Sequence, residues 1–249
     1  MHTKDSLIVQ LSAMLPSDAT VLMHSSCKSL GQMENGGDTI LDALTEYFSR
    51  GLVVLPTHTW ATVNDRQPVY DVLYTPVCIG LLPELFRKRP GVHRSWHPTH
   101  SVAAFGADAE EFVRGDENCP TPCARDSAWG RLYDRDAYVL LVGVELNRMT
   151  FFHGVEEWNG IPGRLKETPN RYVVIPPDGG RIVRDYYPHC GDSSQLYPKA
   201  ETALLHAGAM RMEKLGDATV RLLSCRKSAE VVSSLLKDNP FFFGKAGYR

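Results

Sequence analysis

Residues 20–55, TVLMHSSCKSLGQMENGGDTILDALTEYFSRGLVVL, contain two short apolar runs separated by a helical pattern. The runs at Thr20–His24 and Leu52–Leu55 predict buried strands, and Asp38 is the predicted cap of the helix between them. The buried face of that helix is expected to hold Ile40, Leu41, Leu44, Tyr47 and Phe48. This strand–helix–strand unit predicts a parallel strand pair joined by a right-handed crossover.

The rest of the chain continues the alternation of strands and helices. Further strands are predicted over 101–106, 137–143, 172–175, 181–187 and 218–223, and helices over 79–89, 107–114, 150–158, 199–215 and 228–236. Residues 176–180, PPDGG, predict a hairpin turn, whereas residues 56–76 are expected to form a long loop. We therefore expect an α/β layered fold with a mixed, partly parallel β-sheet, flanking helices and at least one antiparallel hairpin. A single domain is expected over residues 1–249.

Composition argues against several classes of protein. The chain has 249 residues, with 43% hydrophobic and 22% charged residues and a net charge of -2. These values are typical of a globular protein, and the weak net charge does not favour a nucleic-acid partner or an anionic membrane surface. No apolar run is long enough to span a bilayer. Whether the chain forms a homodimer is left open by the sequence.

The amino terminus and the cysteines indicate a cytoplasmic protein. Residues 1–16 lack the continuous apolar run and cleavage site of a signal peptide, so the six cysteines are expected to be reduced. Cys119 and Cys123, with His189 and Cys190, could in principle bind zinc. The alternative, a proline-stiffened loop with incidental cysteines, is favoured, and no metal is expected.

The loop after the first strand is the first candidate site. Ser25, Ser26 and Ser29 offer hydroxyl donors, Lys28 adds a positive charge, and Gly31 follows. Donors of this kind between a strand and a helix can bind phosphate, although the spacing is not that of a P-loop. A solvated loop with turn-forming serines is the alternative.

Histidines mark two further candidates. His97 and His100 precede a predicted strand, where a metal pair would lack a third ligand, so histidines bonded to backbone are favoured. His153 and Glu156 stand three residues apart and would share one face of a helical turn. A carboxylate beside an imidazole orients the ring and raises its pKa, as a general base requires. A surface ion pair is the alternative, and a third group can lie between the two side chains.

The Gly-x-Ser-x-Gly elbow of a hydrolase and the Gly-x-Gly-x-x-Gly fingerprint of a dinucleotide site are both absent. Several segments together instead give the chain its resemblance to a known family. The matching segments are 24–26, 28–31, 36–37, 55–57, 71–76, 94–95, 97–98 with 100–104 and Gly106, 140–144, and His153 with Glu156. In this order and spacing, the chain resembles the aminoglycoside 3-N-acetyltransferases over nearly its whole length.

The resemblance implies a fold distinct from the commoner acetyltransferase fold with its Gly-rich pyrophosphate loop. It implies direct acetyl transfer from acetyl-CoA to an amine without a covalent intermediate. His153 would deprotonate the amine with support from Glu156, and His97 would shape the site. Coenzyme A would contact Ser25, Ser26, Lys28, Ser29 and Gly31, with Ser101 and Val102 along its pantetheine arm. The candidate contacts to the acceptor are Thr57, Asp71 and Glu157.

Departures from the family pattern keep other functions open. Cys27 stands where the family usually has an apolar residue, Val77 and Ala128 also differ, and the loop over 57–71 is shorter. Because loops carry substrate contacts, the acceptor can be an aminoglycoside or an amine on another metabolite, such as an amino sugar or a nucleotide conjugate. A cysteine acyltransferase that uses Cys27 as nucleophile and a non-catalytic CoA-binding relative are the remaining alternatives.

Overall fold

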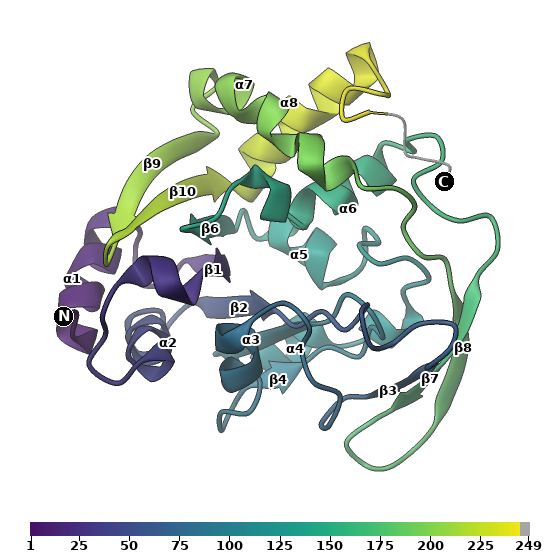
Figure 1. Cartoon of the computed structure of the whole chain (residues 1–249), viewed down its shortest axis with the longest axis horizontal. Coiled ribbons are helices and arrows are strands. Elements are labelled where there is room, and N and C mark those ends of the chain that lie inside the picture. The colour runs from purple at the N-terminus through teal and green to yellow at the C-terminus, as the bar shows by residue number, and fades with distance from the viewer. Residues whose placement is uncertain (245–249) are drawn as a thin grey trace.

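The computed structural model describes residues 1–244 of the chain. A seven-stranded mixed sheet runs through the middle of the molecule (Figure 1), with the strand order β4-β5-β2-β1-β6-β10-β9. The strands are β1 (Thr20–Ser25), β2 (Leu52–Pro56), β4 (His93–Arg94), β5 (Val102–Gly106), β6 (Tyr138–Val142), β9 (Met210–Leu215) and β10 (Ala218–Ser224). As predicted, β1 and β2 are parallel, with Val21 paired to Val53, and β6 extends the parallel set.

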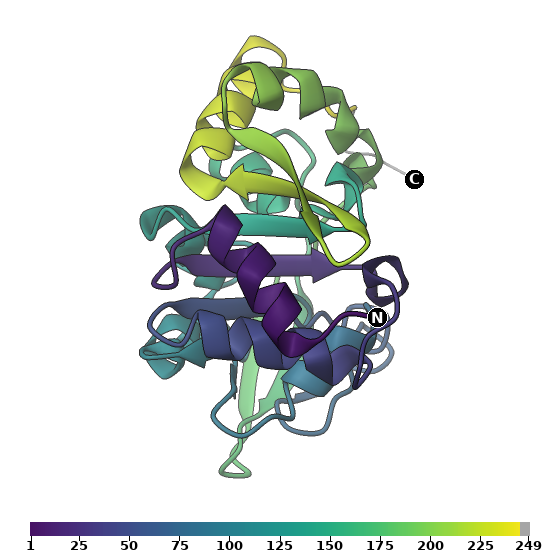
Figure 2. The same ribbon diagram turned by 90° about the vertical axis from the view of Figure 1, so that its left-hand side faces the viewer.

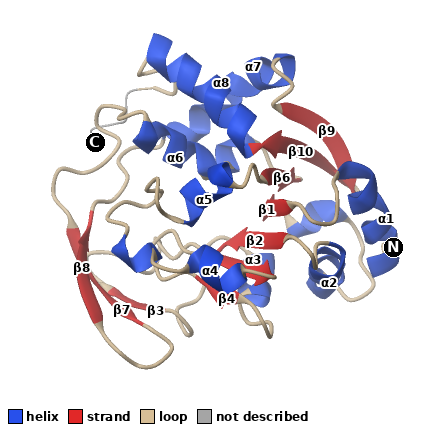
Figure 3. Cartoon of the chain, turned by 180° about the vertical axis from the view of Figure 1, so that it is seen from behind, coloured by secondary structure: helices blue, strands red, loops and turns tan. Residues whose placement is uncertain are grey.

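A second, three-stranded sheet combines β3 (Val69–Asp71), β7 (Asn170–Ile175) and β8 (Ile182–Tyr186). Strands β7 and β8 form the predicted antiparallel hairpin, and β3 pairs in parallel with β7. The predicted long loop over 56–76 therefore contains a strand that short sequence patterns did not reveal. Figure 3 shows this small sheet at the end of the molecule opposite α1.

Helices cover both faces of the large sheet. They are α1 (Lys4–Met14), α2 (Gly37–Tyr47), α3 (Leu81–Phe86), α4 (Ala109–Val113), α5 (Ala128–Asp134), α6 (Phe151–Trp158), α7 (Glu201–His206) and α8 (Cys225–Asp238), with 3₁₀ turns at η1 (Cys27–Leu30), η2 (Asp116–Asn118), η3 (Leu146–Arg148) and η4 (Ser193–Ala200). Helices α1, α2 and α3 pack on one face, and α4 to α8 on the other. Figure 2 shows α1 lying across the strands on the face that it shares with α2 and α3.

The alternation of side chains along the strands explains these two cores. On β1, Val21 and Met23 pack against α1 and α2, whereas Leu22 points into the cluster that contains Trp129 and Phe152. Successive strand residues face opposite sides, so one buried strand supplies both layers. The mixed α/β fold predicted from the sequence is confirmed.

Two details of the predicted elements are wrong. Residues 199–215 do not form one helix, because Gly208, with a φ of 60°, follows α7 and the chain then enters β9. Helix α2 is capped by Gly36 and not by Asp38, whose carboxylate instead binds Arg89 at 2.7 Å. Within residues 1–244, no helix combines the length and apolar character that crossing a membrane requires.

Candidate active site

A cavity of about 880 Å³ lies at the carboxyl ends of the parallel strands β1 and β2, where Ser25 and Pro56 line it. Such an edge is where open α/β sheets bind ligands, because successive loops diverge there. Helix α6 supplies His153 to the wall, and the segment before η4 supplies His189 and Asp192. Further histidine and aromatic side chains on the wall include His24, His58, Trp60 and His100.

His153 has one nitrogen engaged by protein and one that faces the cavity. Its neighbours Phe151, Phe152 and Val155 are fully buried, which fixes the orientation of α6 and turns His153 toward the cavity. Nδ1 contacts the Tyr197 hydroxyl, an Arg164 NH2 group at 2.8 Å and Glu156 Oε2 at 3.4 Å. Within residues 1–244, Nε2 has no hydrogen-bond partner.

Glu156 is buried among polar partners. Its Oε2 accepts hydrogen bonds from Tyr197 at 2.6 Å and from Ser193 at 3.0 Å. Arg164 Nε lies 3.1 Å from the same oxygen as an ion pair, but without the angle of a hydrogen bond. Burial works to raise the pKa of Glu156, but His153, the positive charge of Arg164 and the hydrogen bond from Tyr197 outweigh it, so the pKa is lowered and the carboxylate stays ionised.

The predicted rise in the pKa of His153 is wrong. Burial, together with the positive charge of Arg164, lowers the pKa of His153 to about 4 against the opposite effect of Glu156. Taking the ring out of water disfavours its charged form by more than one carboxylate recovers. The imidazole is therefore neutral at physiological pH, which is the form that can accept a proton.

The ring proton of neutral His153 can lie on either nitrogen, which gives two proton arrangements. In the first, Arg164 donates to Nδ1, and Nε2 carries the ring proton. In the second, Nδ1–H donates to Tyr197, whose single hydroxyl hydrogen goes to Glu156, and the Arg164 NH2 group, which can only donate, has to turn away from Nδ1. Only the second leaves a lone pair on Nε2 in the cavity.

His97 lies behind the cavity and not on its wall. It is 1% exposed, and its Nδ1 accepts hydrogen bonds from the backbone N–H groups of Thr99 and His100 at 3.3 and 3.1 Å. Burial lowers the pKa of His97 to about 3. The side chain thus holds the turn that presents Thr99 and His100 to the cavity.

The predicted coenzyme A residues divide into two groups. Ser25 lines the cavity, and Ser26, Lys28, Ser29 and Gly31 follow it in η1 and its flanks. At Gly31, which has a φ of 84°, a Cβ atom would lie 2.0 Å from Asp217, so this glycine serves a close approach to the β9–β10 turn. Ser101 and Val102 are fully buried beneath the surface.

The three predicted acceptor contacts do not line the cavity. Thr57 is fully buried and hydrogen-bonded to Ser101 at 2.8 Å. Asp71 accepts the backbone N–H groups of Leu73 and Tyr74 at 2.9 and 2.8 Å, which stabilises a turn. The Glu157 side chain is 5% exposed and faces away from the cavity, toward Cys123.

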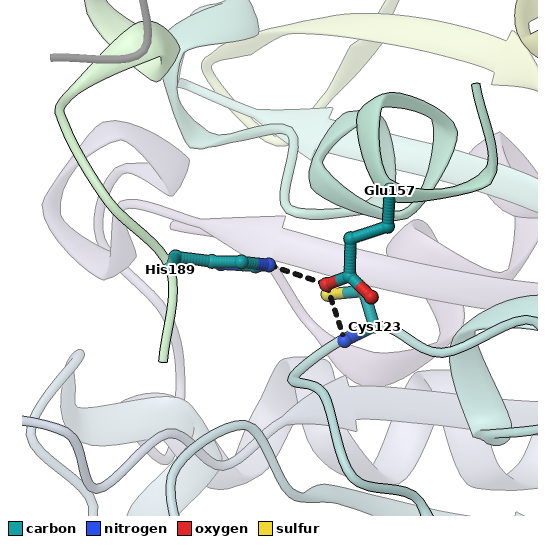
Figure 4. A group of neighbouring side chains, drawn as sticks. All are labelled: Cys123, Glu157 and His189. Atoms are coloured by element: carbon teal, nitrogen blue, oxygen red, sulfur yellow. Dashed lines mark hydrogen bonds and ion pairs between the residues drawn. The ribbon is translucent and has the colours of Figure 1, made fainter. Parts of the chain in front are cut away.

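Glu157, Cys123 and His189 form a group at the cavity, in which Cys123 is buried and the other two are partly buried (Figure 4). The carboxylate accepts hydrogen bonds from Thr121, from the Cys123 backbone N–H at 2.9 Å and from His189 Nε2. A sulfur, an oxygen and a nitrogen lie within 4.8 Å of one another, a set that could hold a metal ion. The hydrogen bond between His189 and Glu157 already joins two of these atoms, and Cys119 lies apart, next to Asp126.

Comparison with known proteins assigns the chain to a family. The aminoglycoside 3-N-acetyltransferase family model matches residues 22–237. The chain belongs to this family. The SPbeta prophage-derived aminoglycoside N(3')-acetyltransferase-like protein YokD of Bacillus subtilis is 28% identical over 260 residues, which cover 96% of this chain and 93% of YokD. Aminoglycoside N(3)-acetyltransferase VII of Streptomyces paromomycinus is 28% identical over 74% of this chain and 70% of its own length.

Solved structures of the family share the fold. The apoenzyme of aminoglycoside acetyltransferase AAC(3)-IVa superposes with a TM-score of 0.83 at 26% identity, covering 97% of this chain and 90% of that enzyme. Crystalline YokD from Bacillus subtilis superposes with a TM-score of 0.82 at 26% identity, covering 96% and 94%. Family membership confirms the predicted enzyme class, a CoA-dependent acyltransferase, and its acetyl-CoA co-substrate.

Sequence reasoning missed several side chains of this acetyltransferase site. Tyr197 and Arg164 contact both His153 and Glu156, yet they come from the short 3₁₀ turn η4 and from the loop after α6, 44 and 11 residues away from the histidine. Neither segment has periodicity that would place its side chains. The pair of His189 and Glu157 was equally hidden, although each residue was considered separately.

Proposed function

We propose that this enzyme transfers an acetyl group directly from acetyl-CoA to an amino group of an aminoglycoside or a similar amine, with Nε2 of His153 as general base. One observation carries this proposal: Nε2 faces the cavity while Nδ1 is backed by Tyr197 and the ionised Glu156. In the second proton arrangement, the ring accepts the amine proton at Nε2, and Glu156 stabilises the resulting imidazolium through Tyr197.

A relative supports an aminoglycoside acceptor. A variant of AAC(3)-IVa with one histidine replaced by alanine has been solved in complex with a gentamicin, and it is 26% identical to this chain with a TM-score of 0.84. For this chain, the cavity offers the carboxylates of Asp65 and Asp192 to a cationic acceptor. Acetyl-CoA would then reach His153 from the side of Ser25, Asn147 and Arg148, which line the same cavity.

A different amine is the second candidate, because the charge of the cavity wall is mixed. Arg148 and Lys166 line it, both are exposed, and neither has an ion-pair partner within residues 1–244. Asp71 and Glu157, expected to bind a polycation, are absent from the wall. An amine on an amino sugar or a nucleotide conjugate, with an anionic group near Lys166, would fit this arrangement.

The position of Cys27 supports direct transfer over a cysteine acyltransferase. Cys27 is half-buried in η1 and packs against the core on the α1 side, and it is not among the residues that line the cavity. His97 would act as a positioning residue, since it supports the turn that carries His100. Single-domain organisation, a cytoplasmic location and a homodimer stay predictions.

The test is a thiol-release assay with acetyl-CoA and a panel of amines that contains aminoglycosides, neutral amino sugars and amines bearing phosphate. Acetylation of an aminoglycoside amine, identified by mass spectrometry, is the expected result. Exclusive turnover of phosphate-bearing amines would establish the second candidate instead. Release of CoA that does not depend on an added amine would contradict the proposed reaction. The absence of CoA release with every amine in the panel would contradict it as well.

A further inference from the structure

A second histidine–carboxylate pair lies beside the first, with its histidine on the cavity wall. Nε2 of His189 is hydrogen-bonded to Oε1 of Glu157, and the two side chains are 10% and 5% exposed (Figure 4). The rings of His189 and His153 have centroids 5.0 Å apart. A single nitrogen atom of a bound acceptor can therefore lie within reach of both imidazoles.

The chemistry of the reaction provides a role for two bases. An alkylamine is mostly an ammonium ion at neutral pH, since alkylamine groups have pKa values near about 10. Conversion of an ammonium ion and acetyl-CoA into an amide and CoA thiol removes two protons from the nitrogen. One of them ends on the CoA sulfur and the other in solvent. His153 accounts for the proton lost during attack, so the proton that must leave before attack needs another acceptor.

We propose that His189 and Glu157 take this first proton from the bound ammonium ion, an inference that rests on the proposed acetyl transfer. The N–H bond of the ammonium breaks, and its proton passes to Nδ1 of His189. In the same step, the proton on Nε2 of His189 passes to Oε1 of Glu157. The neutral amine then attacks the thioester while Nε2 of His153 takes the second proton, which goes to the CoA sulfur. After the product leaves, Glu157 returns its proton to Nε2 of His189, and Nδ1–H of His189, on the cavity wall, releases its proton to solvent, which restores the starting state.

The surroundings of the pair suit such a relay. His189 lines the cavity, and within residues 1–244 its Nδ1 has no hydrogen-bond partner. The groups that face His189 are Glu157, Arg164, His153, His100 and His97. Burial, together with the positive charge of Arg164, keeps the pKa of His189 well below its usual value. The ring therefore passes a proton from one nitrogen to the other side of the relay and does not remain as an imidazolium.

Glu157 is suited to hold the proton. Burial raises the pKa of Glu157 to about 7, although hydrogen bonds from Thr121 and from the Cys123 N–H act in the opposite direction. A carboxylate of this kind is ionised in half of the molecules near neutral pH and can accept a proton there. The nearby Cys123 thiol stays neutral, because burial raises its pKa well above the usual value.

The decisive variant is Glu157→Gln, because an amide preserves the shape and can still accept the hydrogen bond from His189. With an alkylamine acceptor, wild-type kcat/KM should rise with pH through about 7. In the variant, this limb should move to the pKa of the free amine, and kcat/KM at pH 7 should fall by about 100- to 1000-fold, since roughly one alkylamine in a thousand is neutral there.

A matched acceptor separates proton transfer from a structural role. An analogue of the same acceptor with fluorine atoms next to the amine, which bring its pKa below 7, is already neutral when it binds. For this analogue, Glu157→Gln should lower kcat/KM by less than about threefold. An equal loss for both acceptors, or an unmoved pH limb, would overturn the inference while leaving the proposed acetyl transfer intact.

A control and an independent measurement complete the test. Glu201→Gln removes a carboxylate that binds Arg221 at 3.0 Å outside the cavity, and it should keep both the activity and the pH profile. In the ligand-free enzyme, carbon-13 NMR of Glu157 should show a titration near pH 7. Titration below pH 5 would overturn the inference whether or not any acceptor is acetylated.

Discussion

Tyr197 donates its hydroxyl hydrogen to Oε2 of Glu156 at 2.6 Å, and both side chains are buried. Because a phenol has only one hydrogen, this bond leaves the Tyr197 oxygen as an acceptor toward Nδ1 of His153. The carboxylate therefore acts on the imidazole chiefly through the phenol, since its own oxygen lies 3.4 Å from Nδ1. We expect Tyr197 to act as a positioning residue that favours the tautomer with a free Nε2, against Arg164, which donates to Nδ1 in the other tautomer.

Tyr197→Phe should lower kcat by roughly tenfold, because it removes the group that fixes the ring proton on Nδ1. The KM for acetyl-CoA should change little. Loss of a buried hydrogen bond to the Glu156 carboxylate should also lower the free energy of unfolding by about 1–3 kcal/mol. Steady-state kinetics and denaturant unfolding measure the two effects. Nitrogen-15 NMR should show proton density moving from Nδ1 to Nε2 of His153, a change that a merely structural role would not produce.

The buried histidines should make the enzyme sensitive to acid. Burial lowers the pKa of His24 and of His97 to about 3, and that of His153 to about 4. The unfolded chain binds these protons below pH 6.5 and the folded one does not, so stability is full above that pH and is lost as the pH falls. At pH 5.5, each histidine should cost about 1 kcal/mol in the free energy of unfolding.

Denaturant unfolding at pH 7.5 and 5.5 measures this sensitivity. His97→Asn keeps an acceptor near the backbone N–H groups of Thr99 and His100 but does not titrate, so the difference between the two pH values should shrink by about 1 kcal/mol. The exposed His206→Asn serves as control and should leave the difference unchanged. A wild-type stability that is equal at both pH values would contradict the account.

The strands and helices of the large sheet could be predicted because each has its own pattern. β1, β2 and β6 are apolar runs, and α2 repeats its apolar residues at helical spacing. Strand β9 was missed because its alternation follows directly on the helical pattern of α7. The Gly216–Asp217 pair between β9 and β10 is a two-residue hairpin signal that should have separated them.

The candidate site could be predicted only in part, for a physical reason. His153 and Glu156 share one helix, so their spacing was enough to place them on one face. Thr57 and Asp71 carry suitable functional groups, yet their hydrogen bonds are used within the protein. Which way a loop side chain points depends on tertiary contacts such as those of Arg94, which binds the carbonyls of Thr57, Val72 and Thr75.

Lys28→Ala should raise the KM for acetyl-CoA by less than about fivefold, with kcat unchanged. Lys28 is exposed beside the cavity, and an exposed ion pair with a phosphate contributes about 0.2–1 kcal/mol. Arg148 lines the cavity itself, so Arg148→Ala should have the larger effect. Calorimetry of CoA binding at low and high salt measures both, with Lys237→Ala on α8 as the control. Equal affinities for wild type and both variants would place the CoA phosphates elsewhere.

Cys27→Ala should retain most of the activity, because direct transfer needs no thiol nucleophile. Cys27 packs against the core below η1, so the smaller side chain should cost stability more than turnover. Mass spectrometry of the wild-type enzyme mixed with acetyl-CoA alone should detect no acetylated Cys27. A stable adduct, together with an inactive and folded variant, would establish the cysteine acyltransferase.

His153→Ala should lower kcat by about 10²–10⁴-fold, which corresponds to roughly 3–5 kcal/mol of activation free energy. Acetyl-CoA should still bind, because the proposed base interacts with the amine and not with the CoA chain. Since burial brings the pKa of His153 to about 4, the ring is neutral throughout the range from pH 5 to 8. The loss should therefore be uniform over that range, and the limb near pH 7 should persist in the variant.

This persistence distinguishes the two histidine–carboxylate pairs. If His153 were responsible for the limb near neutrality, the limb would disappear in His153→Ala, and Glu157→Gln would leave it in place. Near-wild-type turnover of His153→Ala on the true acceptor would rule out His153 as the base altogether. His189 would then be the strongest candidate, because it lines the same cavity with an Nδ1 that has no partner within residues 1–244, whereas His97 is held behind the wall by the backbone it supports.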